Sequence, residues 1–152
     1  MADNADLIKL YSGRILALAS DIPHHARLTA PQTSVKRRSP LCGSTVIVDL
    51  DMQDGRVSRF GQDVKACALG QAAAAILGQV VVGRSAVELA TARDQLRAML
   101  TANGPVPDAP FNGFEVLKPA QDYRNRHASI LLALDAAAEA SQQLQAQSSS
   151  AL

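Results

Sequence analysis

The sequence predicts an α+β domain in which helices pack on one face of a three-stranded antiparallel sheet. Two observations predict the sheet. Apolar and polar residues alternate along residues 44–52, as in a half-buried strand, and Asp54-Gly55 follows as a hairpin signal. A third observation is the change to helical spacing from Cys67 onward. A helix, three strands and then further helices are the element order of an α+β domain.

Each expected element has a local signal. Amphipathic spacing indicates the helices, Asp21-Ile22-Pro23 ends the first of them, and Ser85 followed by Glu88 forms a capping box that starts another. Three prolines indicate a loop before the last helix. The expected helices cover residues 6–20, 67–82, 85–100 and 121–144, the strands cover residues 27–38, 44–52 and 56–64, and the loop covers residues 104–113.

Length and composition bound the class of protein. A chain of 152 residues that is 47% hydrophobic suits a single domain over residues 1–152, with a polar, frayed tail from about residue 145. A net charge of +1 and 3% aromatic residues argue against nucleic-acid binding. The longest apolar stretch, residues 67–82, is interrupted by glycines and glutamines, so no membrane span is expected. The polar N-terminus is no signal peptide, which favours the cytoplasm.

The two cysteines, Cys42 and Cys67, are too few for a disulfide framework. In a reducing compartment they are thiols that metal or sulfur chemistry can use. Isolated cysteines are also often small buried apolar residues. Composition leaves both interpretations open.

The positions of three residues favour chemistry. Cys42 falls in the turn before a strand, Cys67 falls where a strand gives way to a helix, and His127 falls near the start of the last helix. The free N–H groups at a helix N-terminus favour a thiolate, which makes Cys67 the most informative. His127 shares a helical face with Ile130 and Leu131, so it is equally typical of a packed core histidine.

These motifs together resemble the NifU/IscU/SufU family of iron–sulfur cluster assembly scaffolds. The resemblance rests on Cys42-Gly43, the hairpin, Cys67 opening a helix of small residues, and Arg124-x-x-His127. It covers residues 7–134, nearly the whole chain. It implies a SufE/NifU-like fold.

The resemblance also implies a ligand set and shows where this chain departs from it. Cys42, Cys67 and His127 stand at the three main ligand positions, with His127 in place of a cysteine and Ser44 in place of an aspartate. The implied cargo is iron, a [2Fe–2S] cluster or zinc. Two thiolates and an imidazole suit zinc, and imidazole can also replace thiolate in iron–sulfur centres. A serine hydroxyl is a weak ligand, and Ser44 is more typical of a turn residue.

The family implies a scaffold or carrier rather than an enzyme. Its partners would be a cysteine desulfurase or other sulfur donor and apo iron–sulfur recipient proteins, and a homodimer is left open. The main alternative is a zinc-binding sulfur acceptor or regulatory relative that assembles no clusters, and a third is a fold kept only for protein contacts. No carboxylate is placed as the general base of a zinc hydrolase.

Two groups of cations have two interpretations each. The run of residues 36–38, Lys-Arg-Arg, guides an acidic partner or merely solubilises an edge strand. Arg124 and Arg126 flank His127 and raise the local positive potential, which favours thiolate and sulfide.

Overall fold

The predicted antiparallel sheet is present. The computed structural model describes residues 11–41 and 43–150 of the chain. Its three strands are β1 (Thr33–Arg38), β2 (Thr45–Gln53) and β3 (Arg56–Lys65), and they pair in the order β1-β2-β3. Asp54 and Gly55, both with positive φ, form the turn between β2 and β3 as the sequence predicts.

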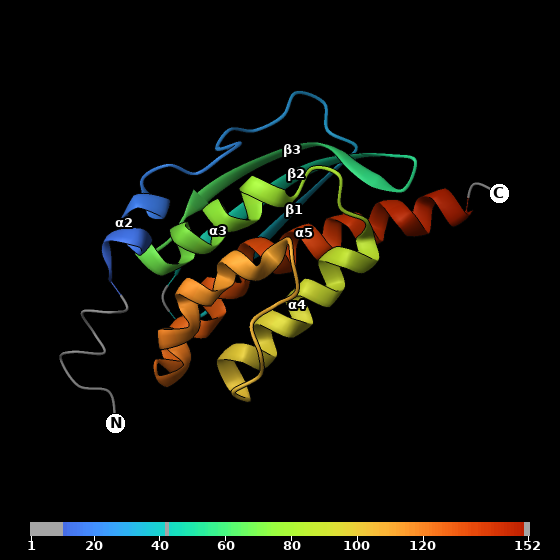
Figure 1. Cartoon of the computed structure of the whole chain (residues 1–152). Helices are drawn as coiled ribbons and strands as arrows, with labels where there is room; N and C mark the ends of the chain where they lie inside the picture. Colours follow the sequence, from blue (N-terminus) through green and yellow to red (C-terminus); the bar gives the residue numbers. More distant parts are fainter. Residues whose placement is uncertain (1–10, 42, 151–152) are drawn as a thin grey trace.

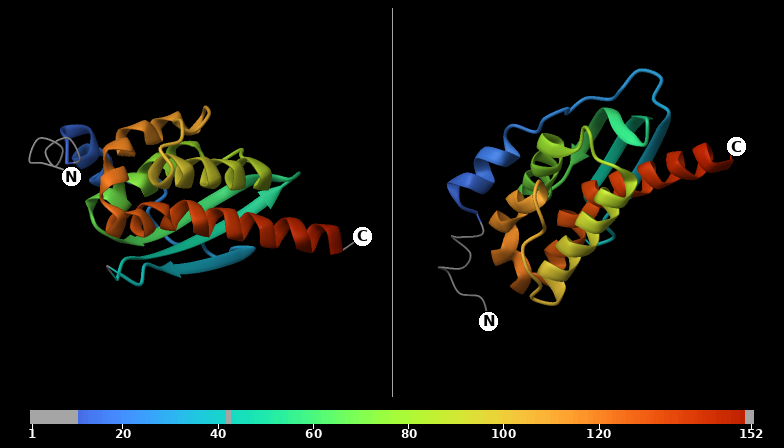
Figure 2. Two further views of the ribbon diagram at one scale, coloured as in Figure 1. Left: turned by 90° about the horizontal axis from the view of Figure 1, so that it is seen from below. Right: turned by 45° about the vertical axis from the view of Figure 1, so that its right-hand side comes forward.

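Helices cover one face of this sheet (Figure 1). Val46, Val48 and Leu50 of β2 point to the helices and are buried beneath them, and the residues between them, Ile47 and Asp49, point to the opposite face. Helix α5 packs on β1 and β2, α3 packs on α5, and α4 lies on the far side of α5 (Figure 2). The helices are α2 (Gly13–Ala19), α3 (Ala68–Val80), α4 (Ala86–Thr101), the 3₁₀ helix η1 (Phe111–Asp122) and α5 (Arg124–Ser150).

The expected capping box is confirmed. The Ser85 side chain accepts a hydrogen bond from the Glu88 backbone N–H, and the Glu88 side chain accepts one from the Ser85 backbone N–H. The first helix is present from Gly13 to Ala19, but Ser12 is its N-cap and Tyr11 is in a turn, so the predicted helix does not run continuously from residue 6. Residues 1–10 lie outside the described residues. No helix in the described part of the chain is long and apolar enough to cross a membrane.

The first strand is shorter than predicted. It begins at Thr33, whereas residues 27–32 cross the outer face of the sheet, the face opposite the helices. The segment leaves the sheet because it supplies partners to the buried carboxylate of Asp49. Arg27 forms an ion pair with Asp49 at 2.7 Å, and the Leu28 N–H donates to the same oxygen. This tertiary contact outweighs the strand-like composition of the segment.

Residues 111–122 form a 3₁₀ helix where the sequence predicts the end of a loop and the start of the last helix. The spacing of the apolar residues explains this helix type once the structure is known. Phe111, Phe114, Leu117 and Ala120 are spaced three apart and are all buried, which matches three residues per turn. Pro119 within this segment disfavours a regular α-helix.

Helix α5 is displaced relative to its predicted range. It begins at Arg124 and continues to Ser150, past the expected end near residue 144. The residues after 120 include no glycine or proline, and glutamine and alanine are good helix formers. The polar tail expected from residue 145 is therefore helical in its described part.

Candidate functional site

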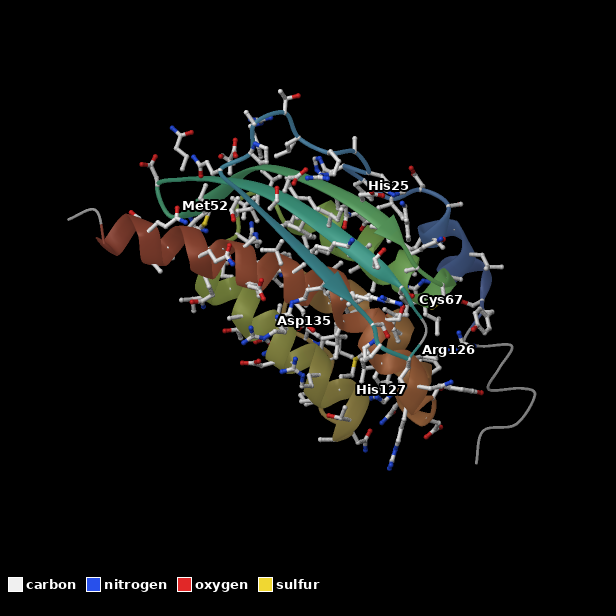
Figure 3. The ribbon with its side chains drawn as sticks, turned by 180° about the vertical axis from the view of Figure 1, so that it is seen from behind. His25, Met52, Cys67, Arg126, His127 and Asp135 are labelled. Carbon is white, nitrogen blue, oxygen red and sulfur yellow. The ribbon has the colours of Figure 1, made fainter. Side chains whose placement is uncertain are left out.

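Cys67 lies at the junction between the sheet and the helical layer. β3 ends at Lys65, and Cys67 is the N-cap residue of α3 with extended backbone angles (φ −65°, ψ 168°). Its side chain is half-buried and packs against the core, at the end of the sheet shown in Figure 3. The strand-to-helix position predicted for this thiol is confirmed.

Two serines connect Cys67 to α5 and β2. Cys67 Sγ lies 3.5 Å from Ser129 Oγ, and Ser129 Oγ lies 3.1 Å from Ser44 Oγ. The single Ser129 proton can be donated to Ser44 or, when Cys67 is ionised, to the sulfur. Helices α3 and α5 approach closely here. A Cβ added at Gly70 would lie only 2.6 Å from Ser129 Oγ. The glycine therefore allows the α5 hydroxyl to reach the thiol.

The surroundings of Cys67 favour the thiolate. Burial by itself raises the pKa of the thiol, but hydrogen bonding from Ser129, from the Gly70 and Leu69 N–H groups and from Arg126 outweighs it, so the pKa lies below its ordinary value. The two N–H groups form no side-chain capping bond with Cys67, yet they stabilise negative charge on its sulfur. Arg126 lowers the pKa of Cys67, as its position in the sequence predicts.

His127 points elsewhere. Its Nε2 lies 2.9 Å from the carbonyl oxygen of Ala120, and the residue is 8% exposed. It lines a cavity of about 400 Å³ between the ends of α4, η1 and α5, together with Asn103 and Arg124. Residues two apart lie on opposite sides of a helix, so α5 presents Ser129 to Cys67 and directs His127 toward η1.

The ring contact also determines the tautomer of His127. A carbonyl oxygen only accepts hydrogen bonds, so Nε2 must carry the proton and donate it to Ala120. In the neutral ring the lone pair is then on Nδ1. A metal-ligating histidine commonly donates its other ring N–H to a carbonyl in this way. The contact is typical of a ligand and of a core histidine alike.

The complete predicted ligand set is not brought together in the described residues. Cys42 lies outside them, and the rest of the described chain contains no group of three His, Cys, Asp or Glu residues that could hold a metal ion. Ser44 is 5% exposed, and its hydroxyl is hydrogen-bonded to Ser129. Ser129 is the contact that sequence reasoning missed. Its spacing of three from Arg126 placed both on one helical face, but nothing local indicated that this face meets α3.

The fold and the site together define a class of protein. It is an α+β domain with an activated cysteine at a strand-to-helix junction. No family model matches the chain, and no curated protein matches it significantly. Among solved structures, it is similar to a nitrogen-fixing NifU-like protein (N-terminal) from Brucella abortus. The identity is 41%, the TM-score is 0.90, and the match covers 92% of this chain and 97% of that one.

A second solved structure shows the same fold. It is a candidate iron–sulfur cluster assembly scaffold protein for the SUF system from Fervidobacterium islandicum, with a TM-score of 0.77 at 16% identity over 88% of this chain and 97% of the other. From the 41% identity over nearly its whole length, the chain belongs to the NifU/IscU/SufU-like family. The predicted family and fold class are confirmed.

Proposed function

We propose that this protein is a scaffold or carrier in iron–sulfur cluster assembly, with Cys67 as the residue that accepts sulfur and holds the cargo. The observation that carries the proposal is the half-buried Cys67 at the N-terminus of α3, with a lowered pKa and a hydroxyl and a guanidinium beside it. These groups stabilise an anionic sulfur in both thiolate and sulfide form. Membership of the family supports the same role.

The sulfur-accepting step follows from thiol exchange chemistry. The Cys67 thiolate attacks the terminal sulfur of a persulfide on a donor such as a cysteine desulfurase. A new S–S bond forms to Cys67, the donor's S–S bond breaks, and the donor leaves as a thiolate. The product is a persulfide on Cys67, and its outer sulfur is released as sulfide when a two-electron reductant, such as a dithiol, cleaves the new S–S bond and regenerates the Cys67 thiolate.

Cys42 and His127 are the proposed further ligands, and Ser44 is a weak fourth candidate. Engagement of His127 requires its ring, now bonded to Ala120, to present Nδ1 to the same metal as Cys67. The cargo would be iron, a [2Fe–2S] cluster or zinc, and apo iron–sulfur proteins would receive it. The proposed compartment is the cytoplasm.

The second candidate function is a zinc-binding sulfur acceptor that assembles no clusters. The observation that favours it is the hydroxyl of Ser44 beside Ser129, where the family has a carboxylate. Two thiolates and one imidazole with an open position suit zinc better than a cluster that needs four ligands.

Metal analysis and anaerobic reconstitution with iron and sulfide separate these functions. Protein purified without a metal-chelating tag should hold about one zinc or iron per chain, and reconstitution should add the visible absorption of a cluster. The Cys67→Ala variant should lose both, whereas Ser85→Ala, an N-cap change on α4, should lose neither. Zinc without a cluster favours the second function. Full metal occupancy in Cys67→Ala would refute the assignment of Cys67.

The double variant Ser44→Asp/His127→Cys tests the two departures. It restores a carboxylate and a thiolate, so it should hold a cluster more readily than the parent. Equal reconstitution by the parent would show that the altered set is itself competent. If neither protein binds metal or cluster, the proposed function is wrong and His127 is a core histidine.

A further inference from the structure

The outer face of the sheet is covered over only half its length. At the hairpin end, Asp49 accepts from Arg27 and from the Leu28 N–H, and Asp51 accepts from the Gln32 N–H at 2.8 Å. Residues 26–32 thus lie directly on this half of the face. Its carboxylates are neutralised and its backbone is shielded.

In the described part of the chain, residues 26–32 make no side-chain or backbone hydrogen bond to the other half of the outer face, and the nearby contact is at the β3 edge, where the His25 ring accepts from the Val64 N–H at 3.3 Å. The strand register places side chains there in two adjacent rows, and alternation along β2 directs both rows away from the helices. We call this half the basic face. It consists of the row Arg38, Thr45 and Lys65 and the row Lys36, Ile47 and Asp63.

The basic face has an excess of unpaired cations. Lys36, Arg38 and Lys65 are all exposed, and none of their side chains forms an ion pair or hydrogen bond within residues 11–41 and 43–150. By contrast, Arg37 points to the inner side and pairs with Glu139 of α5 at 2.8 Å. The three outer cations are therefore available to a partner.

The basic face ends at the proposed sulfur site. Lys65 precedes Cys67 by two residues, and Arg38 leads into the loop between β1 and β2. This loop carries Leu41, which is 72% exposed and is among the most exposed large apolar side chains of the described chain. An exposed apolar residue beside a charged surface is typical of a protein-binding site.

We propose that the basic face, with Leu41 at its end, docks an acidic protein surface and so delivers the partner's reactive group to Cys67. This inference rests on the proposed function and adds the surface that orients the exchange. Opposite charge accelerates encounter and selects the orientation of approach, and Leu41 supplies an apolar contact. Three cations and one carboxylate in two short rows are too few for a nucleic-acid footprint on a chain of net charge +1.

Chemical-shift mapping tests this surface with a defined probe. The full ¹⁵N-labelled chain is titrated with a blocked octaglutamate peptide at low salt, and with octalysine as the charge control. The amide shifts should concentrate on Lys36, Thr45, Ile47 and Lys65, and should weaken as salt is raised. Lys36→Glu should weaken binding about fivefold, because it replaces attraction with repulsion.

Lys118→Glu is the matched control. Lys118 is also exposed and unpaired within the described residues, it lies on η1, and its substitution changes the net charge equally. Binding should change less than about twofold in this variant. Equal weakening by both variants, shifts spread over the whole surface, or equally tight binding of a single-stranded DNA octamer to the basic face would overturn the proposal. A purely solubilising edge strand predicts the first or the second of these results.

Reconstitution with iron and sulfide uses no protein partner, so it separates this inference from the proposed function. If the parent protein reconstitutes a cluster but shows no localised shifts, the proposed function stands and the docking surface is refuted. If the parent protein shows localised shifts and the Lys36→Glu effect but binds no metal or cluster, the docking surface stands and the proposed function is refuted.

Discussion

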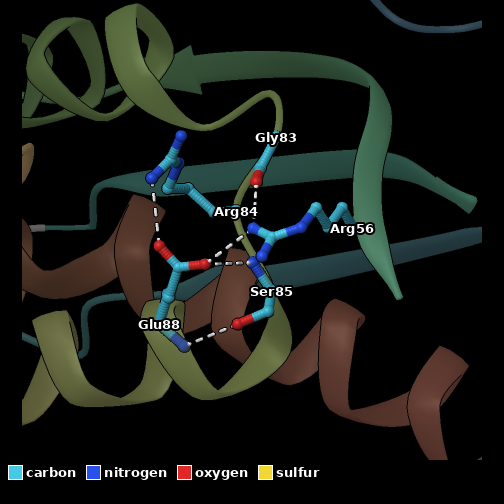
Figure 4. A network of polar contacts seen from close by, with 5 residues as sticks. All are labelled: Arg56, Gly83, Arg84, Ser85 and Glu88. Atoms are coloured by element: carbon cyan, nitrogen blue, oxygen red, sulfur yellow. Dashed lines mark hydrogen bonds and ion pairs between the residues drawn. The ribbon is translucent and has the colours of Figure 1, made fainter. Parts of the chain in front are cut away.

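Two helices of this protein begin in opposite ways. The N-terminus of α4 is closed by its own residues, since Ser85 and Glu88 exchange hydrogen bonds and Glu88 also pairs with Arg56 and Arg84 (Figure 4). The N-terminus of α3 has Cys67 at the equivalent position with no side-chain capping bond. Its N–H groups stabilise charge on the sulfur instead.

The difference teaches how one structural position serves stability or chemistry. A capping side chain satisfies the free N–H groups and contributes about 1 kcal/mol to helix stability. A thiol is a weak acceptor, so the same groups remain available to a thiolate, a persulfide or a bound sulfide. The α3 terminus thus forgoes capping stability and holds a reactive sulfur.

The largest expected effect comes from making the α3 terminus resemble that of α4. In Cys67→Ser the hydroxyl caps the helix, so metal content and thiol reactivity at this position should fall to near zero. The free energy of unfolding should stay unchanged or rise by about 0.5–1 kcal/mol. Metal analysis and urea unfolding of the same preparation check both results. A large loss of stability would show that Cys67 is a structural core residue.

An intermediate effect is expected on the rate of alkylation. In metal-free protein, Cys67 should react with iodoacetamide at lower pH than an ordinary thiol, because its pKa is lowered. As pH falls, its thiolate persists further than that of a free cysteine. Ser129→Ala should shift this pH profile upward, because it removes a hydrogen bond to the sulfur. Site-resolved mass spectrometry from pH 5 to about pH 10 measures both.

The control for alkylation is a thiol introduced at the other helix terminus. In Ser85→Cys the new sulfur faces the Glu88 carboxylate, and repulsion between the two charges disfavours the thiolate. The introduced thiol should therefore alkylate more slowly than Cys67 at neutral pH. Equal rates at the two positions would mean that neither the Glu88 carboxylate nor Ser129 and Arg126 affects the thiol, and that a helix terminus alone sets its reactivity.

The smallest expected effect is on stability at the α4 terminus. Ser85→Ala removes one half of the capping box, so the free energy of unfolding should fall by about 1 kcal/mol. Cluster reconstitution should be unchanged, because Ser85 lies outside the proposed site. Urea unfolding measures the loss. A change in metal content here would contradict the separation of the two termini.

Local patterns were sufficient for the elements that local interactions specify. The alternation in β2, the Asp54-Gly55 turn, the Ser85–Glu88 capping box and the thiol at the start of α3 each involve residues a few positions apart. Such contacts form in the same way wherever the segment is placed. They were therefore predictable from the sequence.

Segments whose conformation depends on contacts with distant residues were predicted wrongly or not at all. Residues 27–32 leave the sheet because the buried carboxylate of Asp49, 22 positions after Arg27, requires a cation as its partner. The η1 segment has an apolar spacing of three that a helical or loop pattern does not anticipate. In both cases the deciding energy comes from burial against residues that are distant in the sequence.

The sequence by itself determined the family, the order of elements and the placement of a thiol at a helix N-terminus, because motif spacing and hydrophobic period are properties of the chain. Only the tertiary structure decided that α5 presents Ser129 to Cys67 and His127 to Ala120. The rotation of a helix about its axis depends on what packs against each side. Here, close contact at Gly70 and burial of the α5 apolar face against α3 and the sheet set that rotation.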